Sequence, residues 1–276
     1  MSATTAYRSI GLDLSGSRNQ KTCVAVLDFY PKGHRIILSE LKTDLGPKSE
    51  MSGDDALLGF LEDLVDPKFK VAGVATTAPV SLPPFFLSAA ICQEQIAWVD
   101  SLLPKTERVQ KPFISYLQRP VEFWLRYLSK ERFANVGDAF GSNWAPLTAR
   151  LAFLKTQIKT EFTEIFFRGA LLRILPSLGL KKELVDEYND LENGLKTRDL
   201  IVRKLCDALP QLFIYDGDVD RLILDLPCFH AFVAAICQHL DLQNLCDEKP
   251  RGLPASATWV LIPQRNLRWS DAVKNP

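Results

Sequence analysis

The chain has 276 residues, with 33 basic and 33 acidic side chains and therefore no formal net charge. Hydrophobic residues make up 47% and charged residues 24%, which is typical of globular proteins and excludes disordered, collagen-like and coiled-coil chains. A protein that coats nucleic acid by bulk electrostatics needs a cationic surplus, so the balanced charge argues against that class but leaves room for a local basic groove.

The sequence indicates a cytoplasmic protein with reduced thiols. Residues 1–6 are polar and lead into no apolar segment of the kind that a secretory signal has. No uncharged apolar run approaches the roughly 18 residues that a membrane span needs. We therefore expect no membrane partner, and we expect the six cysteines to be free.

Three strand-like runs open the chain. They cover residues 7–14, 22–29 and 35–41, and they are rich in Ile, Val and Leu. Short segments containing Gly, Ser, Asn or Pro separate them. Gaps this short favour antiparallel neighbours, so the sequence predicts a three-stranded meander.

A helix is expected over residues 52–65. Ser52 can cap it, and Asp54 and Asp55 favour its positive end, while apolar residues recur behind them at helical spacing. A short apolar run at 71–75 follows. A strand, a helical crossover and another strand predict a parallel addition to the meander.

The remainder is predicted to be mostly helical and to form one α/β domain over residues 1–276. Helical insertions are expected near 85–112 and 177–200. Further helices are expected at 120–133, 146–158, 197–209 and 228–240, and late strands at 162–167 and 258–262.

Asp13 is the first candidate for chemistry. It lies near the end of an apolar strand and precedes the small residues Ser15, Gly16 and Ser17. A carboxylate at such a strand end can hold Mg²⁺. A strand-end Asp that caps its own turn explains the motif equally well.

Four further residues are candidates with simpler explanations. Thr77 ends an apolar run, which a plain loop start explains. Glu122 falls in the first turn of an expected helix, where it can act as a capping carboxylate. Glu164 is flanked by apolar residues and must face solvent, a partner charge or a metal. His230 lies on a helix that is apolar nearly all round, where a hydrogen-bonded core histidine is the default.

Other common motifs are missing or broken. The run Asp216-Gly217-Asp218-Val219-Asp220 begins like a calcium loop, but Arg221 and Pro227 replace the required Gly and Glu, so we predict an acidic turn. The sequence has no G-x-S-x-G, Walker or G-x-G-x-x-G motif. The sequence therefore lacks these motifs of serine hydrolases, NTPases and dinucleotide-binding proteins.

Taken in order, these segments resemble domain-of-unknown-function family 429, a family of predicted nucleases in the ribonuclease H-like superfamily. The matching segments are Gly11-Leu12-Asp13, Thr76-Thr77-Ala78-Pro79-Val80-Ser81-Leu82-Pro83, Arg119-Pro120-Val121-Glu122, Thr163-Glu164-Ile165-Phe166, His230-Ala231 and Trp259-Val260-Leu261-Ile262-Pro263. The resemblance spans nearly the whole chain. It implies a ribonuclease H-like mixed five-stranded sheet, an antiparallel meander plus parallel strands, flanked by helices.

The resemblance also implies phosphodiester hydrolysis with Mg²⁺ or Mn²⁺. Asp13, Glu122 and Glu164 would be the metal ligands. Thr77 and His230 stand where the family pattern has Asp. A neutral hydroxyl and an imidazole are weaker ligands for a hard cation, so the site is expected to be partly degenerate.

Three functions remain open on the sequence. The first is a divalent-metal-dependent nuclease with Asp13, Glu122, Glu164, His230 and Thr77 in its site. The second is a catalytically inactive ribonuclease H-like module that binds a partner. The third is a nucleotide-phosphate binder, because residues 11–17 are similar to the first phosphate loop of actin-like sugar kinases, although no second phosphate loop follows. Nucleic acid is compatible as a partner but not indicated by net charge, and the oligomeric state stays open.

Overall fold

The structure is a computed structural model that describes residues 6–16, 21–43, 45–46, 51–102, 112–131, 133, 135–274 and 276. The chain divides into two units. The sheet unit comprises residues 1–77, 157–247 and 261–276, and the helical unit comprises residues 78–156 and 248–260. We describe each unit by itself.

The expected meander is present. Strands β1 (Ala6–Asp13), β2 (Cys23–Tyr30) and β3 (Arg35–Lys42) pair antiparallel in sequence order. The predicted crossover follows, with α1 (Gly53–Asp63) leading to β4 (Phe69–Thr76), which lies parallel to β1. The strand pattern and the short gaps thus predicted both the elements and their directions.

Among the described residues the sheet has seven strands, and the expected number of five is wrong. Its order is β6-β3-β2-β1-β4-β5-β7, where β5 is Phe162–Ile165, β6 is Leu212–Phe213 and β7 is Val260–Leu261. β5 runs parallel to β4, and β6 runs parallel to β3. β7 lies inside the strand predicted at 258–262, whereas no strand was predicted for β6, whose two residues are too few to show a period in the sequence.

Helix α1 begins as its sequence predicts. The Ser52 hydroxyl accepts a hydrogen bond from the Asp55 backbone N–H, and the Asp55 carboxylate accepts one from the Ser52 backbone N–H. This reciprocal pair satisfies two of the donors that a helix start leaves open. The buried side chains Leu57 and Leu61 then attach the helix to the sheet unit.

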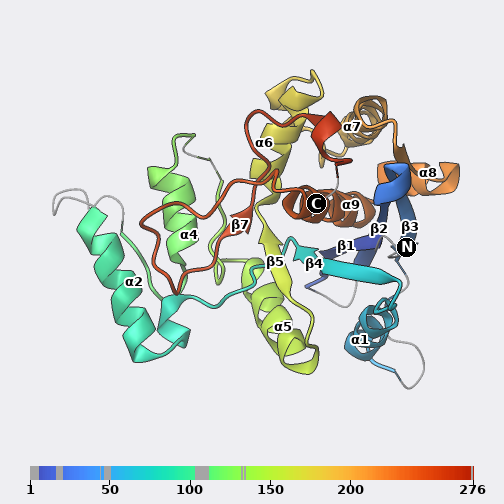
Figure 1. Ribbon diagram of the computed structural model, residues 1–276. Coiled ribbons are helices and arrows are strands. Elements are labelled where there is room, and N and C mark those ends of the chain that lie inside the picture. Colours follow the sequence, from blue (N-terminus) through green and yellow to red (C-terminus); the bar gives the residue numbers. More distant parts are fainter. Residues whose placement is uncertain are drawn as a thin grey trace. The chain divides into compact units, whose positions relative to one another are not determined.

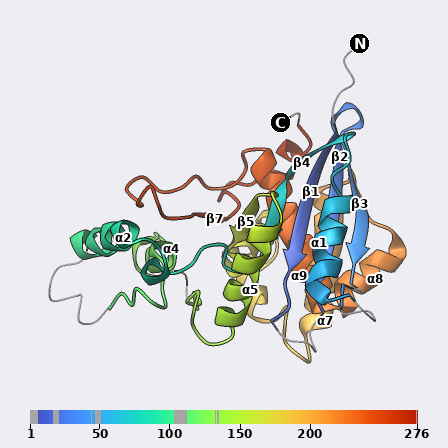
Figure 2. The same cartoon turned by 90° about the horizontal axis from the view of Figure 1, so that it is seen from below.

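Helix α9 (Leu226–Leu242) and helix α1 lie on opposite faces of the sheet (Figures 1 and 2). The apolar sequence of α9 predicted burial, and twelve of its residues are buried. Gly11 of β1 lies against the α9 backbone at Ala231 and Ala235. The odd-numbered core residues of β2, including Ala25, belong to the same apolar cluster as α9. The face of the sheet that carries Gly11 is therefore the α9 face.

Three further α-helices belong to the sheet unit, namely α6 (Phe167–Ser177), α7 (Gly194–Ala208) and α8 (Asp216–Leu224). The acidic run that begins at Asp216 was predicted to be a turn, and that prediction is wrong. It forms the first turn of α8, where Asp216 and Asp218 meet the positive end of the helix. None of the described helices is both long and apolar enough to span a lipid bilayer.

The helical unit contains α2 (Ala89–Leu102), α4 (Pro120–Phe123) and α5 (Trp144–Gln157). The helix expected over 120–133 starts at Pro120 as predicted. However, it changes into a π-helical turn over Trp124–Leu128 and ends there. Helix α2 falls inside the insertion expected near 85–112, of which residues 103–111 lie outside the described residues.

Candidate functional site

Asp13 and Thr77 meet where two parallel strands end. Asp13 is the last residue of β1, and Thr77 directly follows β4, the neighbouring parallel strand. The Thr77 hydroxyl donates a hydrogen bond to Asp13 Oδ1 over 2.8 Å. The Thr77 backbone N–H also points to the carbonyl oxygen of Leu12 at 3.4 Å. The sheet itself therefore holds the two side chains together.

His230 reaches the same carboxylate from α9. Its Nδ1 lies 3.4 Å from Asp13 Oδ1. The imidazole ring packs edge-on against the rings of Phe167 and Tyr188, at centroid distances of 4.5 and 5.8 Å. Its Nε2 is buried, and no described residue forms a hydrogen bond with it. The expected core histidine with a polar partner thus has Asp13 on its Nδ1 side and no described partner on its Nε2 side.

The Asp13 carboxylate influences the ionisation of Tyr188, which lies near it. Burial, reinforced by the nearby negative charge of Asp13, raises the pKa of Tyr188 to about 12, although Arg168 and Arg198 oppose the shift. Tyr188 is therefore a neutral phenol at physiological pH. The wall of the Asp13 site that Phe167 and Tyr188 form is uncharged and aromatic, which suits packing better than the binding of an ion.

Glu164 does not join this group. Leu12, Thr76 and Glu164 stand in register on β1, β4 and β5. Residues in register project from the same face of a sheet, and successive residues project from opposite faces. Asp13 follows Leu12 and meets α9, so Glu164 projects from the face opposite to Asp13. Glu164 is also buried, at 7% exposure, so of the three environments expected for it, solvent, a partner charge or a metal, the first is wrong.

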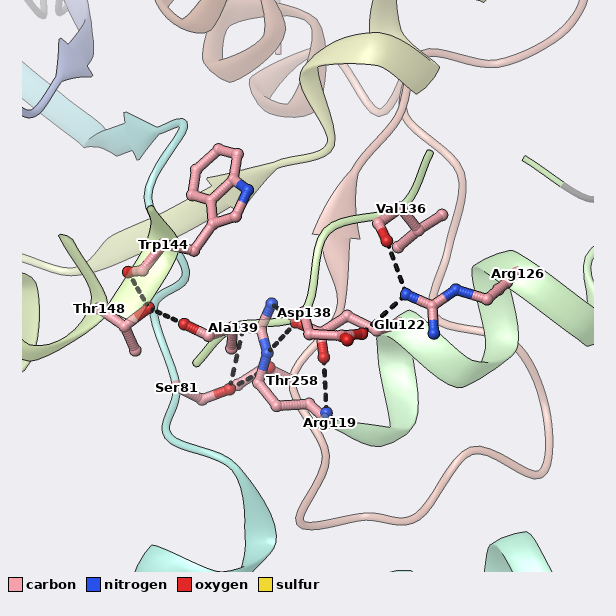
Figure 3. Close-up of polar contacts among 10 residues, drawn as sticks. All are labelled: Ser81, Arg119, Glu122, Arg126, Val136, Asp138, Ala139, Trp144, Thr148 and Thr258. Carbon is pink, nitrogen blue, oxygen red and sulfur yellow. Dashed lines mark hydrogen bonds and ion pairs between the residues drawn. The ribbon is translucent and has the colours of Figure 1, made fainter. Parts of the chain in front are cut away.

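Glu122 belongs to the helical unit and forms an ion pair there (Figure 3). Its Oε1 accepts hydrogen bonds from Arg119 Nε and Nη2 over 2.9 and 2.8 Å, and its Oε2 accepts one from the Arg119 backbone N–H over 2.7 Å. Both residues are almost fully buried. Arg119 Nη1 also reaches the Ser81 hydroxyl at 3.3 Å, and that hydroxyl contacts Thr258 Oγ1 at 2.8 Å. Glu122 thus has the capping role that its sequence position allowed, with an arginine added.

The donor set beside Asp13 fits a hard divalent cation poorly. Within the described part of the chain, no three His, Cys, Asp or Glu side chains are grouped so that they could hold a metal ion. Asp13 supplies one carboxylate, whereas Thr77 supplies a hydroxyl and His230 a nitrogen. Mg²⁺ prefers several anionic or carbonyl oxygens, and imidazole suits softer metals.

Two residues of this region were missed by the sequence analysis. Cys23 lies directly opposite Asp13 in the ladder between β1 and β2, and Cys228 precedes His230 by two residues on α9. Their Sγ atoms are 3.6 Å apart. The feature that places Cys23 beside Asp13 is the register of the β1–β2 hairpin, which cannot be determined from the sequence alone.

The comparisons with known proteins leave the family open. The chain matches no family model, and neither the curated proteins nor the solved structures contain a significant match to it.

Proposed function

We propose that this chain is a ribonuclease H-like module whose metal-dependent phosphodiester hydrolase site is degenerate, and that it acts without catalysis by binding a partner. One observation carries the proposal. The Thr77 hydroxyl donates a hydrogen bond to Asp13 Oδ1, and the His230 imidazole lies beside the same oxygen. Both residues occupy positions where the family pattern has aspartates. The acidic pair that would balance a metal charge is therefore replaced by one hydroxyl donor and one imidazole.

The sheet supports the architectural part of the proposal. Its central strands follow the order β3-β2-β1-β4-β5. The first three are antiparallel and the last two run parallel to β1, as the resemblance implies. A late helix, α9, covers the face on which Asp13 lies. The short strands β6 and β7 are then additions at the two edges.

Charge balance supports the functional part. Two divalent ions held close together need several carboxylates, because each unpaired positive charge in a partly buried site is costly. Within the part of the chain that the structure describes, Asp13 belongs to no group of three His, Cys, Asp or Glu side chains that could hold a metal ion. Its Oδ1 already accepts a hydrogen bond from Thr77. A metal would have to displace that hydrogen bond.

Restoring the two acids tests the proposal. In the double variant Thr77→Asp/His230→Asp, three carboxylates share the strand end, so we expect Mn²⁺ to bind and to raise the Tm. A ligand at 100 times its Kd stabilises the folded state by about 2.7 kcal/mol. The Tm of the unmodified protein should not respond to Mn²⁺. Differential scanning calorimetry with and without Mn²⁺ measures both proteins.

The control adds Asp13→Asn to the double variant, which should remove the Mn²⁺ response. A double variant that folds, as judged by circular dichroism, but whose Tm does not change with Mn²⁺ would contradict the proposal that this site descends from a metal site. Mn²⁺ binding by the unmodified protein would contradict the proposed degeneracy.

The second candidate is a hydrolase that works with Mg²⁺ or Mn²⁺ and a reduced ligand set. It is favoured by the position of Asp13, whose carboxylate is only partly buried at the end of a central strand. A metal there would activate water and stabilise the leaving oxygen. Cleavage of DNA, RNA or a hybrid by the unmodified protein, lost in Asp13→Asn, would establish this candidate and overturn the first.

A further inference from the structure

A pair of buried thiols lies beside the Asp13 site. Cys23 is the first residue of β2, and Cys228 lies in the first turn of α9. Both residues have 0% exposure, and their sulfur atoms are 3.6 Å apart. The two positions are separated by 205 residues in the chain, so only the packing of α9 on the sheet brings the sulfurs together.

We propose that Cys23 and Cys228 are a site of reversible disulfide formation, with hydrogen peroxide as the oxidant. The sulfurs are already in contact and need to approach only from 3.6 Å to about 2.05 Å, the length of a disulfide bond. Both residues lie at the ends of their elements, where a small displacement disturbs few backbone hydrogen bonds.

The chemistry balances with one molecule of peroxide. One thiolate attacks the O–O bond and becomes a sulfenic acid, and the hydroxide that leaves takes up a proton as water. The second sulfur then displaces water from the sulfenic acid, which forms the S–S bond. Two thiols and one peroxide thus give one disulfide and two waters, and the two sulfurs supply the two electrons.

The surroundings make this reaction slow at neutral pH. The hydrogen bond to Cys228 and then burial raise the pKa of Cys23, and the charges of Asp13 and Asp225 add to the shift. Since the thiolate is the reactive form, the rate should rise with pH. Cys92 and Cys206 are only half-buried and should react earlier with small alkylating agents.

The bond would join β2 to the start of α9. Cys23 is paired with Asp13 across the β1–β2 ladder, and His230 follows Cys228 by two residues. The cross-link would therefore hold the first turn of α9, with His230, against the strand end that carries Asp13. A covalent link over 205 residues also restricts the unfolded chain strongly.

Peptide mapping of the full-length protein tests the proposal. The reduced protein is treated with hydrogen peroxide at pH 8.5, its remaining thiols are alkylated, and it is digested with trypsin without reductant. Trypsin leaves Cys23 in residues 22–32 and Cys228 in residues 222–251, together with Cys237 and Cys246. We expect a cross-linked species of these two peptides that dithiothreitol separates.

Single variants assign the bond. Cys228→Ser should abolish the cross-linked species, whereas Cys237→Ser and Cys246→Ser should keep it. The oxidised protein should also have a Tm higher by an amount on the order of 10 °C, reversible by dithiothreitol. Absence of the cross-link while Cys92 and Cys206 are oxidised, or its persistence in Cys228→Ser, would overturn the proposal.

Discussion

Replacing Gly11 by alanine is expected to lower the free energy of unfolding of the sheet unit by about 3–5 kcal/mol, because the new methyl group would meet backbone atoms. A Cβ at position 11 would overlap the carbonyl oxygen of Ala231 and the amide nitrogen of Ala235 in α9. A flexible side chain could rotate away from such an overlap, whereas the backbone of a buried helix has to move as a whole. The entire α9 face of the sheet would be forced apart.

A matched glycine supplies the control. Gly59 lies in the middle of α1, and a Cβ added there meets nothing within 4 Å. Gly59→Ala should therefore stabilise the protein by about 0.5–1 kcal/mol, through the higher helix propensity of alanine. Urea titrations followed by far-ultraviolet circular dichroism compare the two variants. If Gly11→Ala were as stable as the unmodified protein, the close approach of α9 to β1 would be refuted.

Replacing Glu122 by glutamine is expected to lower the free energy of unfolding of the helical unit by about 3–5 kcal/mol, since the change leaves the Arg119 guanidinium buried without its counter-charge. Both carboxylate oxygens of Glu122 accept hydrogen bonds from Arg119. An amide has only one acceptor oxygen, so its NH₂ group would face an N–H donor. The volume of the side chain hardly changes, and packing therefore contributes little to the loss.

An exposed ion pair of similar spacing is the control for Glu122. Arg203 and Asp199 pair on the surface of α7, with 69% and 37% of their side chains exposed. Asp199→Asn should change stability by less than about 0.5 kcal/mol. Tryptophan fluorescence during urea unfolding suits Glu122→Gln, because four of the five tryptophans lie in the helical unit, and far-ultraviolet circular dichroism in the same titration follows Asp199→Asn in the sheet unit. A similarly small effect of Glu122→Gln would show that Arg119 does not depend on this carboxylate.

The two variants also test whether the two units unfold together or separately. Gly11→Ala acts on the sheet unit, and Glu122→Gln acts on the helical unit. If the units unfold together, each variant shifts both the circular dichroism and the fluorescence transitions. If they unfold separately, each variant shifts one transition. The single domain expected from the sequence corresponds to the first outcome.

Local patterns in the sequence were reliable for elements that carry their own signal. The meander, the helix start at Ser52 and the buried character of α9 depend on neighbouring residues and on hydrophobic period, so the sequence predicted them. The helix predicted over 120–133 was wrong in its extent for the same reason. Its Pro120 start is a local feature, but its end in a π-helical turn depends on packing.

The sequence by itself determined the order and direction of the main strands and the position of Asp13 at the end of the first of them. Only the tertiary structure decided which side chains join Asp13. Thr77 does so because β4 lies beside β1, and His230 because α9 packs on that face of the sheet. Glu164 projects from the opposite face because successive residues of a strand alternate. Such meetings depend on register and on helix packing between residues far apart in the chain, and neither leaves a pattern in adjacent residues.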